Sequence, residues 1–292
     1  MLGGAVVFAA TQDFFGAGGG KSQAHEAARR AERFDATRAW RLVRLQLSYG
    51  QRPRGSPQLR ALADRLRPLL PNGRFVGLGP NEPGLRNIVG ELPGRGPPIL
   101  IGAHYDTQSD PVGFVGANDG AAGTAAVVTL ARAFARAPRP ANARALRFVL
   151  FDGEEEPAGC EPFIECGIRG STAYAKRHAA QTRAFVLLDY IAERRGLRFT
   201  REEGSDPELW AQLDRAAGAV GVGSLFSSST SGQILDDHTP FTQRNVAAID
   251  VIDFDYPPRD TLADTLDKVS TRSLDAVGEA VLRLVGSLRR AG

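Results

Sequence analysis

Residues 145–155 read ALRFVLFDGEE, an apolar run that ends in a group of acids. Residues 97–106 (PPILIGAHYD) and 184–191 (AFVLLDYI) have the same form, and two further apolar runs cover residues 85–94 and 246–254. Short, continuously apolar runs are typical of interior strands in a mostly parallel sheet that is covered on both faces. These five segments therefore decide the expected fold.

Helical patterns lie between these runs and around them. Asp35 and Ser56 are expected to cap two early helices, the second with Pro57 at its first position. Further helices are expected at about 119–137, 169–179 and 206–220, and from about Ser270 onward. Strand–helix alternation predicts a single-domain, three-layer α/β/α sandwich with a mostly parallel mixed central sheet over residues 34–292.

The composition is that of an ordinary globular chain. Its 292 residues are 42% apolar and 24% charged, with a net charge of +3 that comes mainly from scattered arginines. No basic run is interleaved with aromatic residues, so we do not expect nucleic acid as a partner.

The first 33 residues differ from the rest. Residues 2–10 (LGGAVVFAA) are apolar, but they are too short for a membrane span of roughly 20 residues and lack the positive start of a signal peptide. They could be the end of an export signal or anchor, followed by a linker, or a disordered N-terminus. The corresponding locations are secreted, periplasmic or membrane-anchored, with the cytoplasm as the alternative.

The two cysteines of the chain, Cys160 and Cys166, lie in one short segment, GCEPFIECG. They could close a small disulfide ring, which would suit an oxidising compartment, or remain reduced thiols.

Acids and a histidine gather where the apolar runs end. In open α/β sheets the carboxyl ends of the strands border the ligand crevice. Clustered carboxylates repel one another and raise each other's pKa, so such a group calls for a cation. Oxygen and imidazole donors without thiolates indicate zinc, with manganese or cobalt as alternatives. The residues concerned are His104, Asp106, Asp152, Glu154, Glu155 and Asp189.

Asp119, in GANDGAAGTAAVV, directly precedes an expected helix. It could be a helix cap, or a carboxylate that bridges two metal ions.

The chain resembles the zinc-dependent M28 aminopeptidases and the related glutaminyl cyclases. The resemblance covers roughly residues 35–290 and rests on ordered motifs: RPRGS (52–56), HYD (104–106), GANDGAAG (116–123), FDGEE (151–155), GIRGSTAYA (167–175), LLDY (187–190), DDHTPF (236–241) and DTLADTLDKVS (260–270).

The resemblance implies a metal ligand at four positions. His104 and Asp189 would hold one ion, Asp119 would bridge to a second, and Glu155 would bind the second.

It also implies two roles beside the metal. Glu154 would be the general base that takes a proton from a metal-activated water, and Asp106 would orient His104. The family's last ligand is a histidine, whereas this chain has Asp260.

Three interpretations of Asp260 are open. It could bind the second ion directly, His238 could reach that place, or the second site could be weak or empty. His238, with Asp237, is otherwise expected at a helix start or in the substrate pocket.

The resemblance implies a peptide or a small amide as the substrate, and the expected reaction is hydrolysis that removes N-terminal residues with one or two zinc ions. The alternatives are glutaminyl-peptide cyclisation with one zinc, and an inactive binding module on the same fold. A serine hydrolase or a nucleotide enzyme is disfavoured, because no GxSxG, Walker or GxGxxG motif is found in the expected context.

Overall fold

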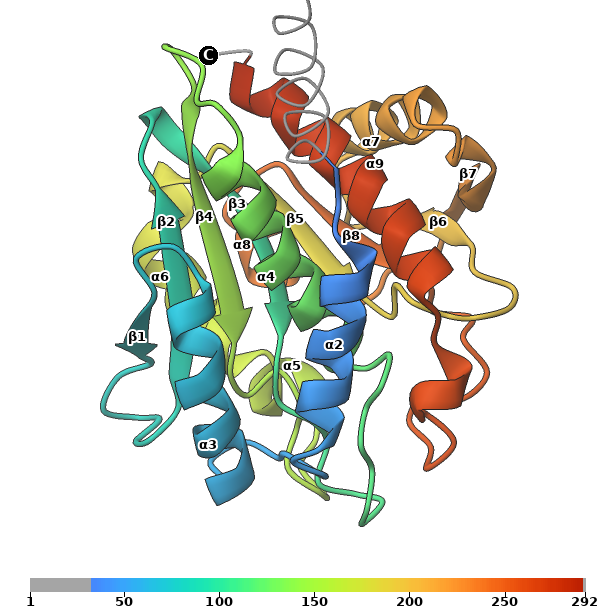
Figure 1. Cartoon of the computed structure of the whole chain (residues 1–292). Coiled ribbons are helices and arrows are strands. Elements are labelled where there is room, and N and C mark those ends of the chain that lie inside the picture. The colour runs from blue at the N-terminus through green and yellow to red at the C-terminus, as the bar shows by residue number, and fades with distance from the viewer. Residues whose placement is uncertain (1–32, 291–292) are drawn as a thin grey trace, which may run out of the picture.

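The structure is a computed structural model, and it describes residues 33–290 (Figure 1). The predicted tail and linker of residues 1–33 therefore lies outside the described residues, except for Arg33.

A six-stranded mixed sheet forms the centre of the domain, in the order β1-β2-β4-β3-β5-β8. The pairs β4–β3, β3–β5 and β5–β8 are parallel, and the pairs β1–β2 and β2–β4 are antiparallel. The strands are β1 (Arg74–Gly77), β2 (Arg86–Leu92), β3 (Arg95–His104), β4 (Arg144–Phe151), β5 (Ala184–Asp189) and β8 (Ala248–Ile252). The mostly parallel mixed sheet predicted from the apolar runs is confirmed.

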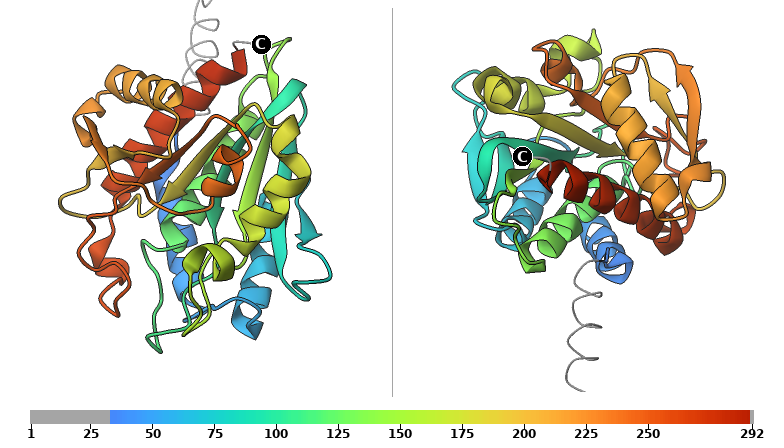
Figure 2. Two further views of the ribbon diagram at one scale, coloured as in Figure 1. Left: turned by 180° about the vertical axis from the view of Figure 1, so that it is seen from behind. Right: turned by 90° about the horizontal axis from the view of Figure 1, so that it is seen from above.

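Helices cover both faces of this sheet, as Figure 2 shows from above. Helices α2, α3, α4 and α9 lie on one face, and α6 and α8 lie on the other. Their bounds are α2 (Ala36–Leu47), α3 (Pro57–Leu66), α4 (Ala121–Arg136), α6 (Arg169–His178), α8 (Thr239–Thr242) and α9 (Thr271–Arg290), with a short α5 (Phe163–Cys166). This is the predicted three-layer sandwich.

Local sequence accounts for the first two helices. The Asp35 carboxylate accepts a hydrogen bond from the Arg38 amide at 2.9 Å, and the Ser56 hydroxyl accepts one from the Leu59 amide at 3.0 Å. Both side chains thus satisfy a free amide of the first turn, as the sequence predicted.

Two parts of the chain differ from the prediction. Helix α4 begins at Ala121 with Gly120 as its cap, so Asp119 is not the cap residue. Strands β6 (Phe199–Glu202) and β7 (Phe226–Ser231) form a separate two-stranded parallel sheet next to α7 (Pro207–Ala219). These strands, like β1, lack a continuous apolar run, which is why the pattern did not predict them.

Among residues 33–290, no helix is long and apolar enough to cross a membrane.

Candidate metal and catalytic site

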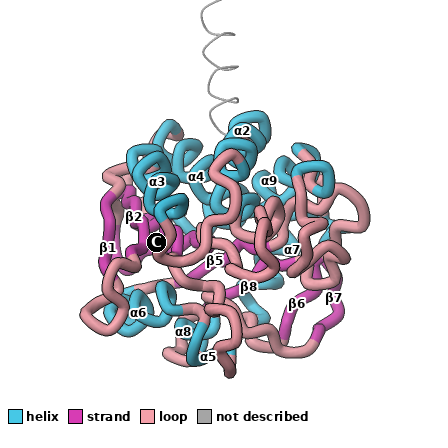
Figure 3. Tube along the Cα trace, turned by 90° about the horizontal axis from the view of Figure 1, so that it is seen from below, coloured by secondary structure: helices cyan, strands magenta, loops and turns pink. Residues whose placement is uncertain are grey.

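The site lies at the carboxyl edge of the sheet, where the polar ends of three parallel strands meet. His104 is the last residue of β3 and pairs in register with Phe151, the last residue of β4. Asp189 is the last residue of β5, on the other side of β3. Loops leave this edge at the lower end of the molecule in Figure 1 and face the viewer in Figure 3.

Two groups of side chains at this edge share His104. Its Nε2 atom lies 3.2 Å from Asp119 Oδ1 and 3.4 Å from Asp189 Oδ1, and all three residues are buried. Its Nδ1 atom lies 3.8 Å from Glu154 Oε2, and Glu155 completes this second group. In each group the donor atoms lie within 4.8 Å of one another, close enough for one metal ion to bind them.

Asp119 is held in place by its backbone. The Asp264 carboxylate accepts hydrogen bonds from the amides of Asn118 and Asp119, both at 3.0 Å. The next residue, Gly120, has φ +76°, and a β-carbon there would lie 3.1 Å from the His104 ring. Only glycine gives this backbone both the conformation and the room. The Asp119 side chain can therefore face His104 instead of capping α4.

Glu154 and Glu155 are held in the same way by Asp106. The Asp106 carboxylate accepts the Glu154 amide at 3.3 Å and the Glu155 amide at 3.2 Å. Its distance to His104 Nδ1 is 3.7 Å, longer than a hydrogen bond. Asp106 thus contacts the loop of the two glutamates more closely than the imidazole that it was predicted to orient.

The site is strongly acidic, and burial perturbs its side chains. Burial and the neighbouring Glu155 raise the pKa of Glu154 well above its ordinary value, and burial and Asp119 do the same for Glu155. Burial raises the pKa of Asp189 to about 7, with a contribution from Asp236. Burial alone would lower the pKa of His104, but hydrogen bonds with the surrounding acids raise it well above its usual range. Repulsion among the acids therefore opposes their ionisation until a cation is bound.

The donor set fits a divalent cation. The buried atoms Glu155 Oε1 and His104 Nδ1 have no hydrogen-bond partner among the described residues. Unsatisfied buried polar atoms are costly, so their presence in the group of His104, Glu154 and Glu155 indicates a missing partner. Carboxylate oxygens and an imidazole without thiolates suit zinc, manganese or cobalt.

Asp260 lies at the border of this site. Its Oδ1 atom is 3.1 Å from the Tyr190 hydroxyl, which is also 2.8 Å from Asp119 Oδ2. Its Oδ2 atom accepts a hydrogen bond from Arg259 at 2.9 Å, and half of the side chain is exposed. Asp260 is thus linked to Asp119 through a tyrosine, while an arginine competes for its carboxylate.

His238 lies away from open solvent. It precedes α8, as predicted for a helix start, and is only 1% exposed. Its Nε2 atom lies 3.1 Å from Glu202 Oε1. His238 therefore belongs to a buried network instead of the wall of an open pocket. Asp237 is also fully buried, and both its carboxylate oxygens lack hydrogen-bond partners within the described chain.

Sequence reasoning missed three residues near the site. The negative charge of the buried Asp236 raises the pKa of both Glu154 and Asp189. Tyr190 and Asp264 hold Asp119, as described above. The doubled acid in DDHTPF was the available signal for Asp236, whereas the positions of the other two follow only from the folded loops.

Cys160 and Cys166 form a disulfide. The loop that it closes returns to the site, because the amides of Ile168 and Arg169 donate to the carbonyls of Glu154 and Gly153, both at 2.7 Å.

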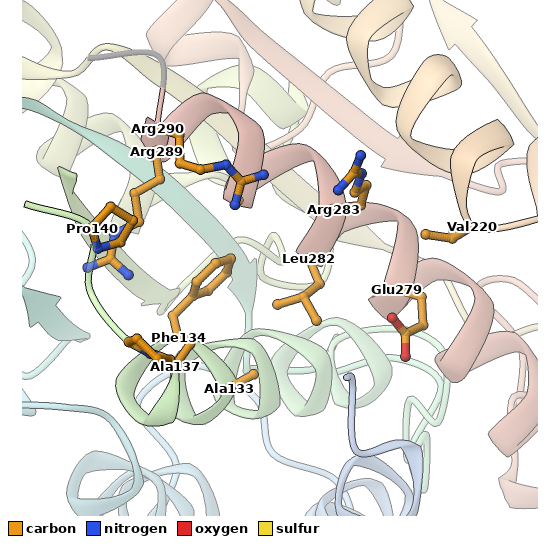
Figure 4. A pocket seen from close by; sticks show the side chains of 12 residues that line it. Ala133, Phe134, Ala137, Pro140, Val220, Glu279, Leu282, Arg283, Arg289 and Arg290 are labelled. Carbon is orange, nitrogen blue, oxygen red and sulfur yellow. The ribbon is translucent and has the colours of Figure 1, made fainter. Parts of the chain in front are cut away.

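A cavity of about 400 Å³ lies elsewhere, between the end of α4 and α9 (Figure 4). None of the site residues lines it.

Comparison with known proteins bears on the family and the fold of this chain. The sequence profile described as Peptidase family M28 matches residues 87–285. The structure of a glutaminyl cyclase from an Acidobacteriales bacterium has a TM-score of 0.75 and 26% identity, and the match covers 89% of this chain and 96% of that one. The Fimbriiglobus ruber glutaminyl cyclase has a TM-score of 0.70 and 28% identity, and the match covers 86% of this chain and 95% of that one. A leucine aminopeptidase precursor from Bacteroides thetaiotaomicron has a TM-score of 0.76 and 24% identity, with 87% and 97% covered, and shares the fold.

Proposed function

Because this chain belongs to peptidase family M28, whose members include metal-dependent enzymes, we propose that it is a metal-dependent glutaminyl-peptide cyclotransferase. In this reaction the α-amine of an N-terminal glutamine attacks the carbon of its own side-chain amide. A carbon–nitrogen bond forms, the bond to the amide nitrogen breaks, and ammonia leaves.

The observation that carries this proposal is the state of Asp260. A hydrolase with two ions needs a complete ligand set for each, and Asp260 would complete the second set. Its carboxylate is half exposed and bonded to Arg259 and Tyr190. Cyclisation uses the substrate's own amine as the nucleophile, so one complete site is sufficient. The glutaminyl cyclases named above, at 26% and 28% identity, support the same choice.

The ligands of a single ion would come from the group His104, Asp119, Glu155 and Asp189, and Asp260 would be needed only for a second ion. When bound, a divalent ion would polarise the side-chain carbonyl of the substrate and neutralise charge that develops on its oxygen.

The protein side chains would bind the amine and move the proton. The acidic site attracts the α-ammonium group, and its charge disfavours an acidic side chain at the same place. Glu154 would take a proton from the amine and deliver it to the leaving nitrogen, so that no net proton is consumed. The negative charge of Asp236 raises the pKa of Glu154 and would help Glu154 to hold that proton during the transfer.

Removal of N-terminal residues by hydrolysis is the second candidate. One contact favours it: the Tyr190 hydroxyl lies between the carboxylates of Asp119 and Asp260. These two carboxylates are therefore near enough to each other to share a second ion. An Asp260 carboxylate that left Arg259 could complete that set.

Product analysis separates the two reactions. The protein is loaded with zinc, manganese or cobalt and given a peptide that begins with glutamine. Cyclisation releases ammonia and leaves a blocked peptide, whereas hydrolysis releases free glutamine. Free glutamine without ammonia would reject the cyclase proposal. Neither product with any of the three metals would favour an inactive binding module.

We also propose that the protein works outside the cytoplasm, because the Cys160–Cys166 disulfide suits an oxidising compartment. Thiol labelling of protein isolated from its native cells tests this, since free thiols on both cysteines would contradict it.

A further inference from the structure

Most of the exposed large hydrophobic side chains in the described part of the chain follow the ends of strands. Among residues 33–290 there are five: Val112, Ile164, Leu235, Phe254 and Leu262. Four of them lie in loops that follow β3, β7 and β8, and Ile164 lies in the short helix α5 after β4. Single exposed hydrophobic residues are normal on a protein surface, but they are normally scattered. We call this set the apolar rim.

Three members of the apolar rim lie close in sequence to residues of the acidic site. Val112 lies between Asp106 and Asp119 in the loop after β3. Leu235 directly precedes Asp236, and Leu262 lies two residues after Asp260. The same loops therefore carry charged groups into the site and apolar groups to its border.

The two most exposed members also lie near each other in space. Val112 is 82% exposed and Leu262 is 56% exposed. A β-carbon added at Gly113, next to Val112, would lie 3.8 Å from Leu262 Cδ2. The Gln108 side-chain amide lies 3.5 Å from Asp260 Oδ1, at the outer limit of a hydrogen bond, so the two loops approach each other at the site. Val112 and Leu262 thus lie on two neighbouring loops beside Asp260.

We propose that the apolar rim, centred on Val112 and Leu262, binds the side chains of the substrate residues that follow the N-terminal one, and that it selects apolar side chains there. The inference rests on the proposed function, in which the N-terminal residue enters the acidic site.

Geometry and charge both favour this occupant. Consecutive residues of an extended peptide advance by about 3.3 Å, so the second and third residues leave the buried acids and reach their border. There they meet exposed valine and leucine side chains, which gain by being covered. An acidic substrate side chain at the same place would be repelled by the carboxylates within the site.

The test compares two peptides of equal length, one with leucine and one with serine after the N-terminal glutamine. The wild-type protein should have a kcat/KM for the leucine peptide about tenfold above that for the serine peptide, since one apolar contact is worth roughly this factor. The double variant Val112→Ser/Leu262→Ser should lower this ratio by about tenfold. Because both side chains are exposed, neither substitution empties the core.

Val220→Ser is the matched control, because Val220 lines the cavity between α4 and α9, away from the site. It should leave the ratio unchanged. A wild-type ratio near one, or a ratio that the double variant does not alter, would overturn the proposal.

The design separates this proposal from the proposed function. If free glutamine appears instead of ammonia, cyclisation is rejected and the same ratio is measured for hydrolysis. If neither product forms, the dissociation constants of the two peptides for the metal-loaded protein, from calorimetry, give the ratio.

Discussion

Two regions at opposite ends of this molecule contrast in their chemistry. The cavity between α4 and α9 has a volume of about 400 Å³, and its charged lining is three arginines and one acid, Glu279 (Figure 4). The carboxyl edge of the sheet gathers buried acids around one histidine. A cavity is therefore not by itself evidence of a functional site.

Hydrogen bonding explains why the two regions differ. In the cavity, Arg289 donates to the carbonyl of Arg144 at 3.2 Å, and its guanidinium lies 5.9 Å from the centre of the Phe134 ring. At the carboxyl edge, buried donor atoms of Glu155 and His104 lack hydrogen-bond partners within the described chain. Buried, perturbed and unpartnered groups indicate function more directly than volume does.

The largest effect on turnover is expected when Glu154 can no longer accept a proton. Glu154→Gln should lower turnover by about 10³-fold, because the amide cannot accept and return a proton. Bound metal should remain, as measured by elemental analysis.

The matched substitution in the other region is Glu279→Gln, which removes the acid of the cavity. It should leave turnover unchanged. Full activity of Glu154→Gln would rule out Glu154 as the base. Loss of activity in Glu279→Gln would contradict the claim that the carboxyl edge, and not the cavity, carries the function.

Metal removal should destabilise the carboxyl edge. An ion that binds only the folded state at 1,000 times its dissociation constant adds about 4 kcal/mol to the free energy of unfolding. Chelation should therefore lower the melting temperature and abolish activity, and added zinc should restore both. Calorimetry checks this, with Arg283→Gln in the cavity as a variant that should respond to zinc as the wild type does. A chelated protein with unchanged melting temperature would contradict a metal site.

A smaller effect is expected at Asp260. Asp260→His should tighten zinc binding by about tenfold, because an imidazole replaces a carboxylate that Arg259 competes for. The backbone there has φ +58°, a conformation that both aspartate and histidine tolerate. Titration with a zinc indicator measures the change, and Asp255→His, at an exposed position outside the site, is the control. Unchanged stoichiometry and affinity would argue against Asp260 as a ligand.

The sequence alone predicted one part of this contrast well. His104, Glu154 and Asp189 follow apolar runs, so their meeting at one edge follows from the parallel sheet. The role of Asp119 could not be decided from the sequence, since the residue before a helix is usually its cap. Only the backbone conformation of Gly120 and the hydrogen bond to the Asp264 carboxylate turn Asp119 toward His104.

Other parts depend on contacts that no local pattern encodes. Asp236 lies near Glu154 only because of the loop that follows β7, a strand with the sequence FSSSTS and no apolar run. The neighbours Arg259 and Tyr190 of Asp260 likewise follow from loop conformation. Strand ends are predictable from periodicity, whereas long loops are not.

The smallest expected effect concerns Asp253, a buried acid after β8 that is not among the proposed ligands. Burial and a hydrogen bond with Glu193 raise the pKa of Asp253 to about 8, against an ordinary value of 3.8. Between these values the folded protein holds a proton that the unfolded chain releases, so this contribution to stability is present at low pH and is lost as the pH rises toward 8. Asp253→Asn can donate to Glu193 at any pH. At pH 8 the variant should therefore melt about 3 °C above the wild type, corresponding to roughly 1 kcal/mol, and the difference should vanish near pH 4. Thermal melts across this range check the prediction, with Asp214→Asn, on the exposed side of α7, as the control. A difference that is independent of pH would mean that Asp253 and Glu193 share no proton.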